Sequence, residues 1–215
     1  MRRIVIDELL DSDSGTAREI ADSLEDLRRI NRWFGGISTT EAILRRALLQ
    51  TRLSQCSVLD VAAGSGDVIC GAIERVAPGS QVTLLDAHAS HLPPRSNTVV
   101  GDALHLPFAD GSFDFVSCSL FAHHLEPAQL AQFAREALRV ARHALLINDL
   151  VRHPMHLALV YASLPLHRRI SRYDSVASLR RSYTPTEMRT ILSPVGSRLE
   201  ISRFYLFRMG VILWK

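Results

Sequence analysis

Acidic residues and glycines lie at two points in the first half of the chain, where short apolar runs end. A loop of small residues, 62–66, directly follows the first run and its terminal Asp60, and the second run ends at Asp86. Glycine lets a backbone approach a ligand closely, and a carboxylate at a strand end can accept two hydrogen bonds from ribose hydroxyls. The pattern therefore indicates a nucleoside site, although Asp86 could instead cap a helix or end a strand in solvent.

Two histidines and an acid follow later apolar runs. His123 and His124 come after the run that ends near residue 119, and Asp149 ends the next run. An imidazole titrates near neutral pH and can take a proton from a hydroxyl. These three residues are the candidate catalytic residues. Histidines that line or support a cofactor site, and an Asp that caps the next segment, are the alternatives.

Metal-ligand spacing is weak along the chain. His153 and His156 lie three positions apart, which on a helix places them on one face, but no third ligand follows at a recognisable distance. Cys56, Cys70 and Cys118 form no paired motif and lie in or beside apolar segments. We therefore predict no metal site and reduced, packed cysteines.

Short apolar runs alternate with helical patterns from residue 56 onward, which is typical of a doubly wound sheet. Thr184-Pro185 followed by Glu187 predicts a helix over 185–192. The fold class is therefore α/β, with a mostly parallel sheet and an antiparallel C-terminal strand. The predicted strands are 57–62, 81–86, 97–100, 113–119, 143–149, 198–207 and 209–214, the last two joined by a tight turn, and two further helices span 65–77 and 127–142.

The N-terminal fifty residues have the periodicity of amphipathic helices. Capping boxes begin at Thr16 and Ser38, and we expect residues 1–50 to form a helical lid on a Rossmann-like domain, 51–215. Residues 150–183 interrupt the alternation and predict a helical cap over a site. Aromatic side chains in these two segments could line an acceptor pocket, although core packing is the commoner role: Trp33, Phe34, Tyr161, Tyr173 and Tyr183.

The loop after Asp60 resembles the DxGxGxG loop of class I S-adenosylmethionine (SAM) dependent methyltransferases, with Ala62 in the place of the first glycine. Residues 99–108 resemble the segment that follows the family's third strand, and 113–121 resemble its fourth strand. These motifs occur in the family's order and spacing. A nicotinamide-dinucleotide fold is the competing interpretation, but its third glycine is replaced by Ile69.

The resemblance implies roles for individual residues. Asp86 would bind the ribose, Asp102 would accept the adenine amino group, and the amide of Ala103 would meet a ring nitrogen. The residues assigned to the cofactor are Asp60, Ala62, Gly64, Ser65, Gly66, Asp86, Ala87, Asp102, Ala103 and Ser119.

The resemblance also implies methyl transfer from SAM, with S-adenosylhomocysteine (SAH) as the product. Related enzymes that use magnesium carry an acid after the fourth strand, where Ser119 and Leu120 stand here. We expect a small-molecule acceptor methylated on oxygen, such as a phenol. Carbon methylation of a quinone-like ring, as in ubiquinone and menaquinone methyltransferases, and a non-catalytic SAM-binding protein are the alternatives.

Composition agrees with a small-molecule enzyme. The 215 residues are 47% hydrophobic and have a formal net charge of +3, with basic and acidic residues interspersed. This does not suggest a nucleic-acid binder. Asp7, Asp11 and Asp13 interrupt any early apolar run, so we expect no signal peptide, no membrane span and a cytoplasmic location.

Overall fold

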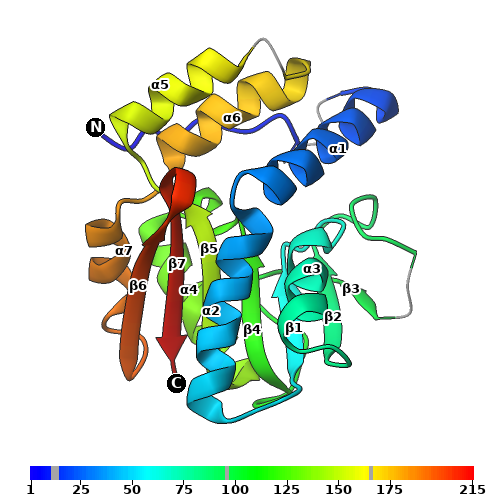
Figure 1. The fold of residues 1–215 in the computed structure, drawn as a ribbon, viewed down its shortest axis with the longest axis vertical. Coiled ribbons are helices and arrows are strands. Elements are labelled where there is room, and N and C mark those ends of the chain that lie inside the picture. The colour runs from blue at the N-terminus through cyan, green and yellow to red at the C-terminus, as the bar shows by residue number, and fades with distance from the viewer. Residues whose placement is uncertain (11–14, 95–96, 165–166) are drawn as a thin grey trace.

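The computed structural model of the protein describes residues 1–10, 15–94, 97–164 and 167–215, and its centre is a seven-stranded sheet (Figure 1). The strands lie in the order β3-β2-β1-β4-β5-β7-β6. β1 to β5 run parallel, whereas β7 is antiparallel to both β5 and β6. The predicted fold class is confirmed. The strands are β1 Ser57–Val61, β2 Gln81–Asp86, β3 Thr98–Val100, β4 Phe113–Ser119, β5 Ala141–Leu150, β6 Arg198–Phe204 and β7 Arg208–Trp214.

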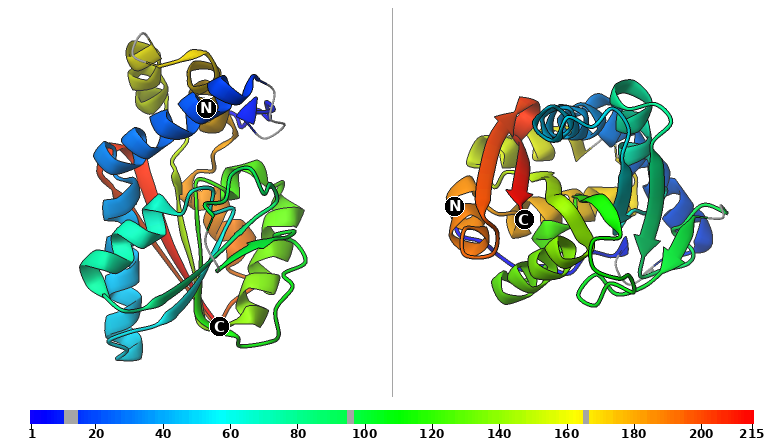
Figure 2. Two further views of the ribbon diagram at one scale, coloured as in Figure 1. Left: turned by 90° about the vertical axis from the view of Figure 1, so that its right-hand side faces the viewer. Right: turned by 90° about the horizontal axis from the view of Figure 1, so that it is seen from below.

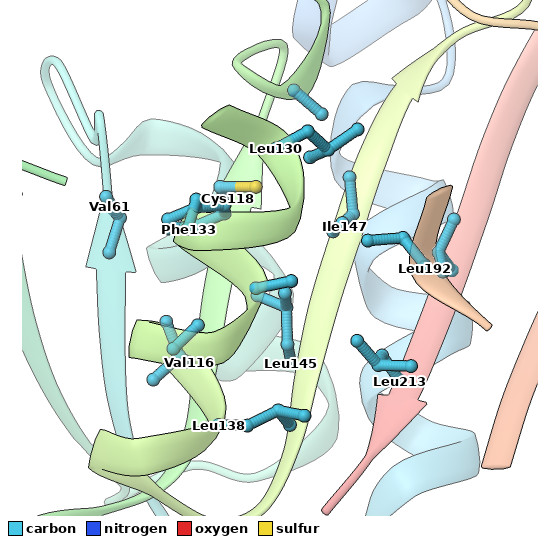
Figure 3. Close-up of a cluster of buried hydrophobic side chains, with 14 of the residues drawn as sticks. Val61, Val116, Cys118, Leu130, Phe133, Leu138, Leu145, Ile147, Leu192 and Leu213 are labelled. Carbon is cyan, nitrogen blue, oxygen red and sulfur yellow. The ribbon is translucent and has the colours of Figure 1, made fainter. Parts of the chain in front are cut away.

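Helices cover both faces of this sheet (Figure 2). α2 (Gly36–Thr51) and α3 (Asp67–Val76) pack on one face, and α4 (Pro127–Val140) and α7 (Pro185–Leu192) pack on the other. Successive strand residues point to opposite faces, so β5 supplies Leu145 and Ile147 to one core and Leu146 to the other. Figure 3 shows the core under α4, where Leu130 and Phe133 lie over Val116 and Cys118.

Three further helices lie across the carboxyl ends of the parallel strands: α1 (Ala17–Trp33), α5 (Pro154–Ser163) and α6 (Arg169–Arg181) (Figures 1 and 2). α1 and α6 are joined by a buried hydrogen bond between the hydroxyls of Ser23 and Ser171, at 3.3 Å. The predicted cap over 150–183 therefore contains α5 and α6, apart from residues 165–166, which lie outside the described residues. α2 packs on the sheet, so within the predicted lid α1 and the segment before it lie above the site.

Two local predictions need correction. Ser38 does not begin a helix, because α2 already starts at Gly36, with Gly35 as its N-cap at φ 82°. The close approach of α1 requires glycine at this start, since a β-carbon on Gly36 would lie 2.6 Å from Asn31 Cα. The strand predicted for 198–207 ends at Phe204, because a short 3-10 turn, η4 (Tyr205–Phe207), reverses the chain.

The capping boxes at Thr16 and Thr184 are both confirmed. Within the described parts of the chain, no helix combines the length and the apolar composition of a membrane span.

Candidate active site

A cavity of about 630 Å³ lies at the carboxyl ends of β1, β2 and β4, under the roof of α1, α5 and α6. This is the edge at which open α/β sheets bind ligands, and the volume suits a small molecule. The predicted cofactor residues that line it are Asp60, Ala62, Gly64, Ser65, Asp86, Ala87, Ala103 and Ser119. Gly66 and Asp102 are the two that do not.

The loop between β1 and α3 has three residues in the left-handed region, at φ 54° for Ala62, 51° for Gly64 and 70° for Gly66. A β-carbon on Gly66 would lie 2.6 Å from Leu84 Cδ1, so glycine is required there by packing. A β-carbon on Gly64 would meet no protein atom within 4 Å. Gly64 therefore presents bare backbone to the cavity, which is the close approach that a bound cofactor needs. Ala62 adopts the glycine-like conformation despite its side chain.

Asp60 lies next to the end of β1 and has a buried carboxyl group that accepts a hydrogen bond from the Ser117 hydroxyl. Burial, together with the charges of Asp67 and Asp86, raises the pKa of Asp60 to about 7 against the opposing effect of that hydrogen bond. The carboxyl group thus ties β1 to β4 beneath the glycine loop.

Asp86 holds the glycine loop from the end of β2. Its Oδ2 accepts from the Gly64 amide at 2.9 Å, and its Oδ1 accepts from the His88 amide at 3.0 Å. Burial would raise the pKa of Asp86, but hydrogen bonds from His91 and these amides lower it. The charged carboxylate still has lone pairs for further donors, so its position fits a ribose diol.

Asp102 lies at the surface, with its side chain 60% exposed. Its carboxylate accepts from the Leu104 amide at 2.8 Å and contacts His105 Nδ1 at 2.8 Å, which lowers the pKa of Asp102. Its neighbours Gly101 and Ala103 line the cavity. In this arrangement Asp102 caps its own turn, and its contact with adenine stays a prediction.

His123 is held on the far side of the cavity by groups from two other segments. Its Nδ1 lies 2.7 Å from Asp149 Oδ1, its amide donates to Asp149 Oδ2 at 3.0 Å, and its Nε2 lies 3.3 Å from Glu8 Oε1. Burial would lower the pKa of His123, but the charge and hydrogen bond of Asp149, together with Glu8, raise it to about 10. A protonated ring cannot accept a proton, so His123 is poorly suited to be the general base.

His124 faces the same carboxylate, with Nε2 3.7 Å from Glu8 Oε1, and its side chain is 18% exposed. It also lines the cavity, unlike Asp149, which supports His123 from behind. The structure therefore brings together all three predicted catalytic residues. Their chemical roles stay predictions.

Glu8 and Arg208 are charged residues of this site that the sequence analysis did not predict. Glu8 comes from the segment before α1, and Arg208 begins β7. Arg208 is 1% exposed and donates to the Phe34 carbonyl and to Asn31 Oδ1, at 3.2 and 3.3 Å. Burial lowers the pKa of Arg208 to about 10. Among the described residues no carboxylate forms an ion pair with its guanidinium.

The roof of the cavity combines apolar side chains of α1 and α5 with polar side chains that include those of α6. Of the aromatic residues predicted to line an acceptor pocket, Phe34 does so, whereas Trp33, Tyr161 and Tyr173 are exposed. Tyr183 is buried elsewhere and donates to the Leu125 carbonyl. His156 lines the cavity while His153 does not, and the apolar lining comes from α1 and α5: Leu24, Leu27, Ile30, Leu159 and Val160.

Comparison with known proteins gives two kinds of likeness. Residues 59–144 match a family model described as a methyltransferase domain. Ubiquinone/menaquinone biosynthesis C-methyltransferases UbiE of Dinoroseobacter shibae and Paracoccus denitrificans are 36% and 38% identical to the chain over 97 and 96 residues. Those matches span 40% and 38% of this chain, and 38% of each relative's length.

The fold extends the likeness beyond the matched sequence. The plantazolicin methyltransferase BpumL, solved with a pentazolic desmethylPZN analogue and SAH, superposes with a TM-score of 0.73 at 13% identity, over 96% of this chain and 93% of that one. A SAM dependent methyltransferase from Aquifex aeolicus gives 0.56 at 19% identity, over 79% and 88% of the two chains. At these identities the likeness concerns the fold.

Proposed function

The chain carries a class I SAM-dependent methyltransferase domain, and on that premise we propose that it methylates an oxygen of a small, largely apolar, hydroxylated metabolite. Bound SAM supplies an already activated methyl group. The protein has to position the acceptor in line with that group and keep water out. The apolar roof formed by α1 and α5 serves the second task.

The residues of the glycine loop and of β2 fit the nucleoside part of the cofactor. The Gly64 backbone faces open cavity, and the Asp86 carboxylate is placed to accept from the ribose hydroxyls. Both positions come from the part of the chain that matches the family model. We therefore assign this side of the cavity to SAM and the opposite side, under α5, to the acceptor.

The observation that carries the choice of acceptor is Arg208. A buried guanidinium without a carboxylate partner is costly to keep in a protein interior, and here it lines the cavity. An acceptor oxygen that is anionic when it reacts would offset that cost. A phenolate has this charge beside an apolar ring, and the ring matches the surrounding apolar lining.

His124 is the proposed general base for that oxygen. Both histidines line the cavity and lie near Glu8, but Asp149 and Glu8 raise the pKa of His123 to about 10, so its ring is already protonated. Asp149 then acts through His123 as a positioning residue.

The test is to incubate the purified protein with SAM labelled with ¹³C in its methyl group and a panel of phenols, catechols and hydroquinones. Carbon-detected NMR separates a methyl on oxygen from one on a ring carbon by chemical shift. We expect methyl ethers, formed more slowly by His124→Gln. SAM binding without transfer to any member of the panel would favour the non-catalytic alternative.

Carbon methylation is the second candidate, because the UbiE relatives that match the chain are named C-methyltransferases. A hydroxylated ring attacks through carbon when its oxygen is deprotonated, so the same Arg208 would stabilise the reacting form. In the labelling experiment this candidate predicts a methyl group on a ring carbon adjacent to the hydroxyl and no methyl ether.

A further inference from the structure

Three potential metal ligands meet at the end of the cavity that lies beside η2 (Ala122–His124). Glu8 Oε1 lies 3.3 Å from His123 Nε2 and 3.7 Å from His124 Nε2, and the three ligand atoms all lie within 4.8 Å of one another. We propose that Glu8, His123 and His124 bind a divalent transition-metal ion, zinc in the first place. The proposal does not depend on methyl transfer.

The distances from Glu8 to the two histidine nitrogens are close to those of a single ion site, and all three ligand atoms lie within 4.8 Å of one another. Zinc holds histidine nitrogen and carboxylate oxygen at about 2.1 Å, so two ligands of one tetrahedral site lie about 3.4 Å apart. The observed 3.3 Å agrees with this, and the 3.7 Å separation needs a shift of His124 by a few tenths of an ångström. Two histidines and one glutamate are also a ligand set of catalytic zinc sites, which leave a fourth position open.

A carboxylate behind His123 completes the arrangement. Asp149 Oδ1 contacts Nδ1 at 2.7 Å, so the ring is fixed with Nε2 pointing at Glu8, and a bound ion would displace the proton that Nε2 carries in the protonated ring. Metal-binding histidines commonly use their second nitrogen in this way, which sets the tautomer and makes the ligating nitrogen more basic. The two carboxylates also carry the negative charge that a divalent cation balances.

The segment that carries Glu8 is anchored on both sides. Before it, the Arg3 guanidinium donates to the carbonyls of His123 and Leu125, at 3.2 and 3.1 Å. After it, the amides of Leu9 and Leu10 donate to the Asp174 carboxylate, at 2.8 and 3.1 Å. Glu8 is therefore positioned before any ion arrives, and ion binding requires little rearrangement.

The three ligands line the cavity, so the open position of the ion would face the acceptor side. A water molecule bound to zinc loses a proton near neutral pH, and an acceptor hydroxyl bound there would be deprotonated for the same reason. In that arrangement the ion would take over the task assigned above to His124, because a nitrogen that ligates the metal cannot accept a proton. Metal content therefore decides between these two roles.

The experiment measures zinc binding directly. The protein is stripped with a chelator, checked by circular dichroism, and titrated with Zn²⁺ alone in the absence of SAM, with bound metal counted by mass spectrometry. We expect about one tightly bound zinc per chain. Co²⁺ in its place should give the visible absorption bands of a tetrahedral site.

Glu8→Gln and His124→Gln remove one ligand each and should weaken zinc binding by at least about 100-fold, more than the loss of an outer partner of a ligand. Asp7→Asn, an exposed neighbour of Glu8, and His156→Gln, which lines the cavity outside the cluster, are the matched controls and should bind zinc as the unaltered protein does.

Failure to retain zinc in the unaltered protein would overturn the proposal. Equal zinc binding by Glu8→Gln, His124→Gln and the two controls would overturn it as well, because the ion would then be bound elsewhere. Either result leaves the methyl-transfer experiment unaffected, since that experiment depends on SAM and the acceptor.

Discussion

The two ends of the cavity are built in different ways. The cofactor end is formed by residues 60–66 and 84–88, which follow two neighbouring parallel strands and hold one another through backbone amides. The opposite end joins Glu8, His123, Asp149 and Arg208, which come from four distant parts of the chain and interact through charged side chains. Cofactor binding therefore depends on a local backbone geometry. The choice of acceptor, in contrast, can change when a single side chain is replaced.

The largest effect should come from Gly66→Ala, at the cofactor end. The substitution forces a β-carbon to 2.6 Å from Leu84 Cδ1 at φ 70°, and we expect a loss of about 4 kcal/mol in the free energy of unfolding. Gly64→Ala meets open space, so it should lose about 1 kcal/mol of stability but much of its SAM affinity. Urea unfolding measures the stability of each variant, and calorimetry measures its affinity for SAM. Unchanged SAM affinity in Gly64→Ala would contradict the assignment of Gly64 to the cofactor.

The next effect concerns pH and Asp60. Its pKa is about 7 in the folded protein and near 4 when unfolded, so the folded state keeps a proton that the unfolded state has lost. The free energy of unfolding should then fall by about 2 kcal/mol from pH 5 to pH 7 through this group. Asp60→Asn should flatten this slope, while the exposed control Asp7→Asn should not. An unchanged slope in Asp60→Asn would show that Asp60 is not the titrating group.

Arg208→Met tests the acceptor end. Loss of a charged donor costs about 2 kcal/mol, so KM for the acceptor should rise about 30-fold while the Kd for SAM stays within about twofold. Arg203→Met, an exposed change on the adjacent strand, is the control and should alter neither. Weaker SAM binding in Arg208→Met would mean that Arg208 contributes to both the cofactor end and the acceptor end of the cavity.

The smallest effect should come from Trp33→Ala on the roof. The side chain is 72% exposed and does not line the cavity, so we expect less than about 0.5 kcal/mol of change in stability and no change in SAM affinity. Thermal unfolding and calorimetry check both. A clear loss of acceptor turnover would instead show that Trp33 contributes to the acceptor pocket.

Much of the fold could be predicted from the sequence because its signals are local. Buried parallel strands appear as short apolar runs. The capping boxes at Thr16 and Thr184 mark the starts of α1 and α7, and each box is contained in four consecutive residues. The box at Ser38 was misleading because α2 already begins at Gly36, after the left-handed N-cap Gly35 and close to Asn31 of α1. Such a contact between helices leaves no mark in a local pattern.

The same distinction holds for the site. The acids Asp60 and Asp86 were predictable because each lies at or next to the end of an apolar strand. Glu8 and Arg208 were not, because neither belongs to a motif, and their burial depends on which distant segments meet above β4 and β5. Asp102 shows the converse: its motif was recognisable, but the surface exposure of its carboxylate was not.

Calorimetry with SAM and SAH tests the central assignment most directly, on the unaltered protein and on Asp86→Ala. We expect one site with micromolar affinity for both ligands, and a loss of about 30-fold in Asp86→Ala, because a charged acceptor of the ribose hydroxyls contributes about 2 kcal/mol. No binding at millimolar ligand would contradict the assignment of the cavity to SAM. Unchanged affinity in Asp86→Ala would contradict the position of the ribose at the end of β2.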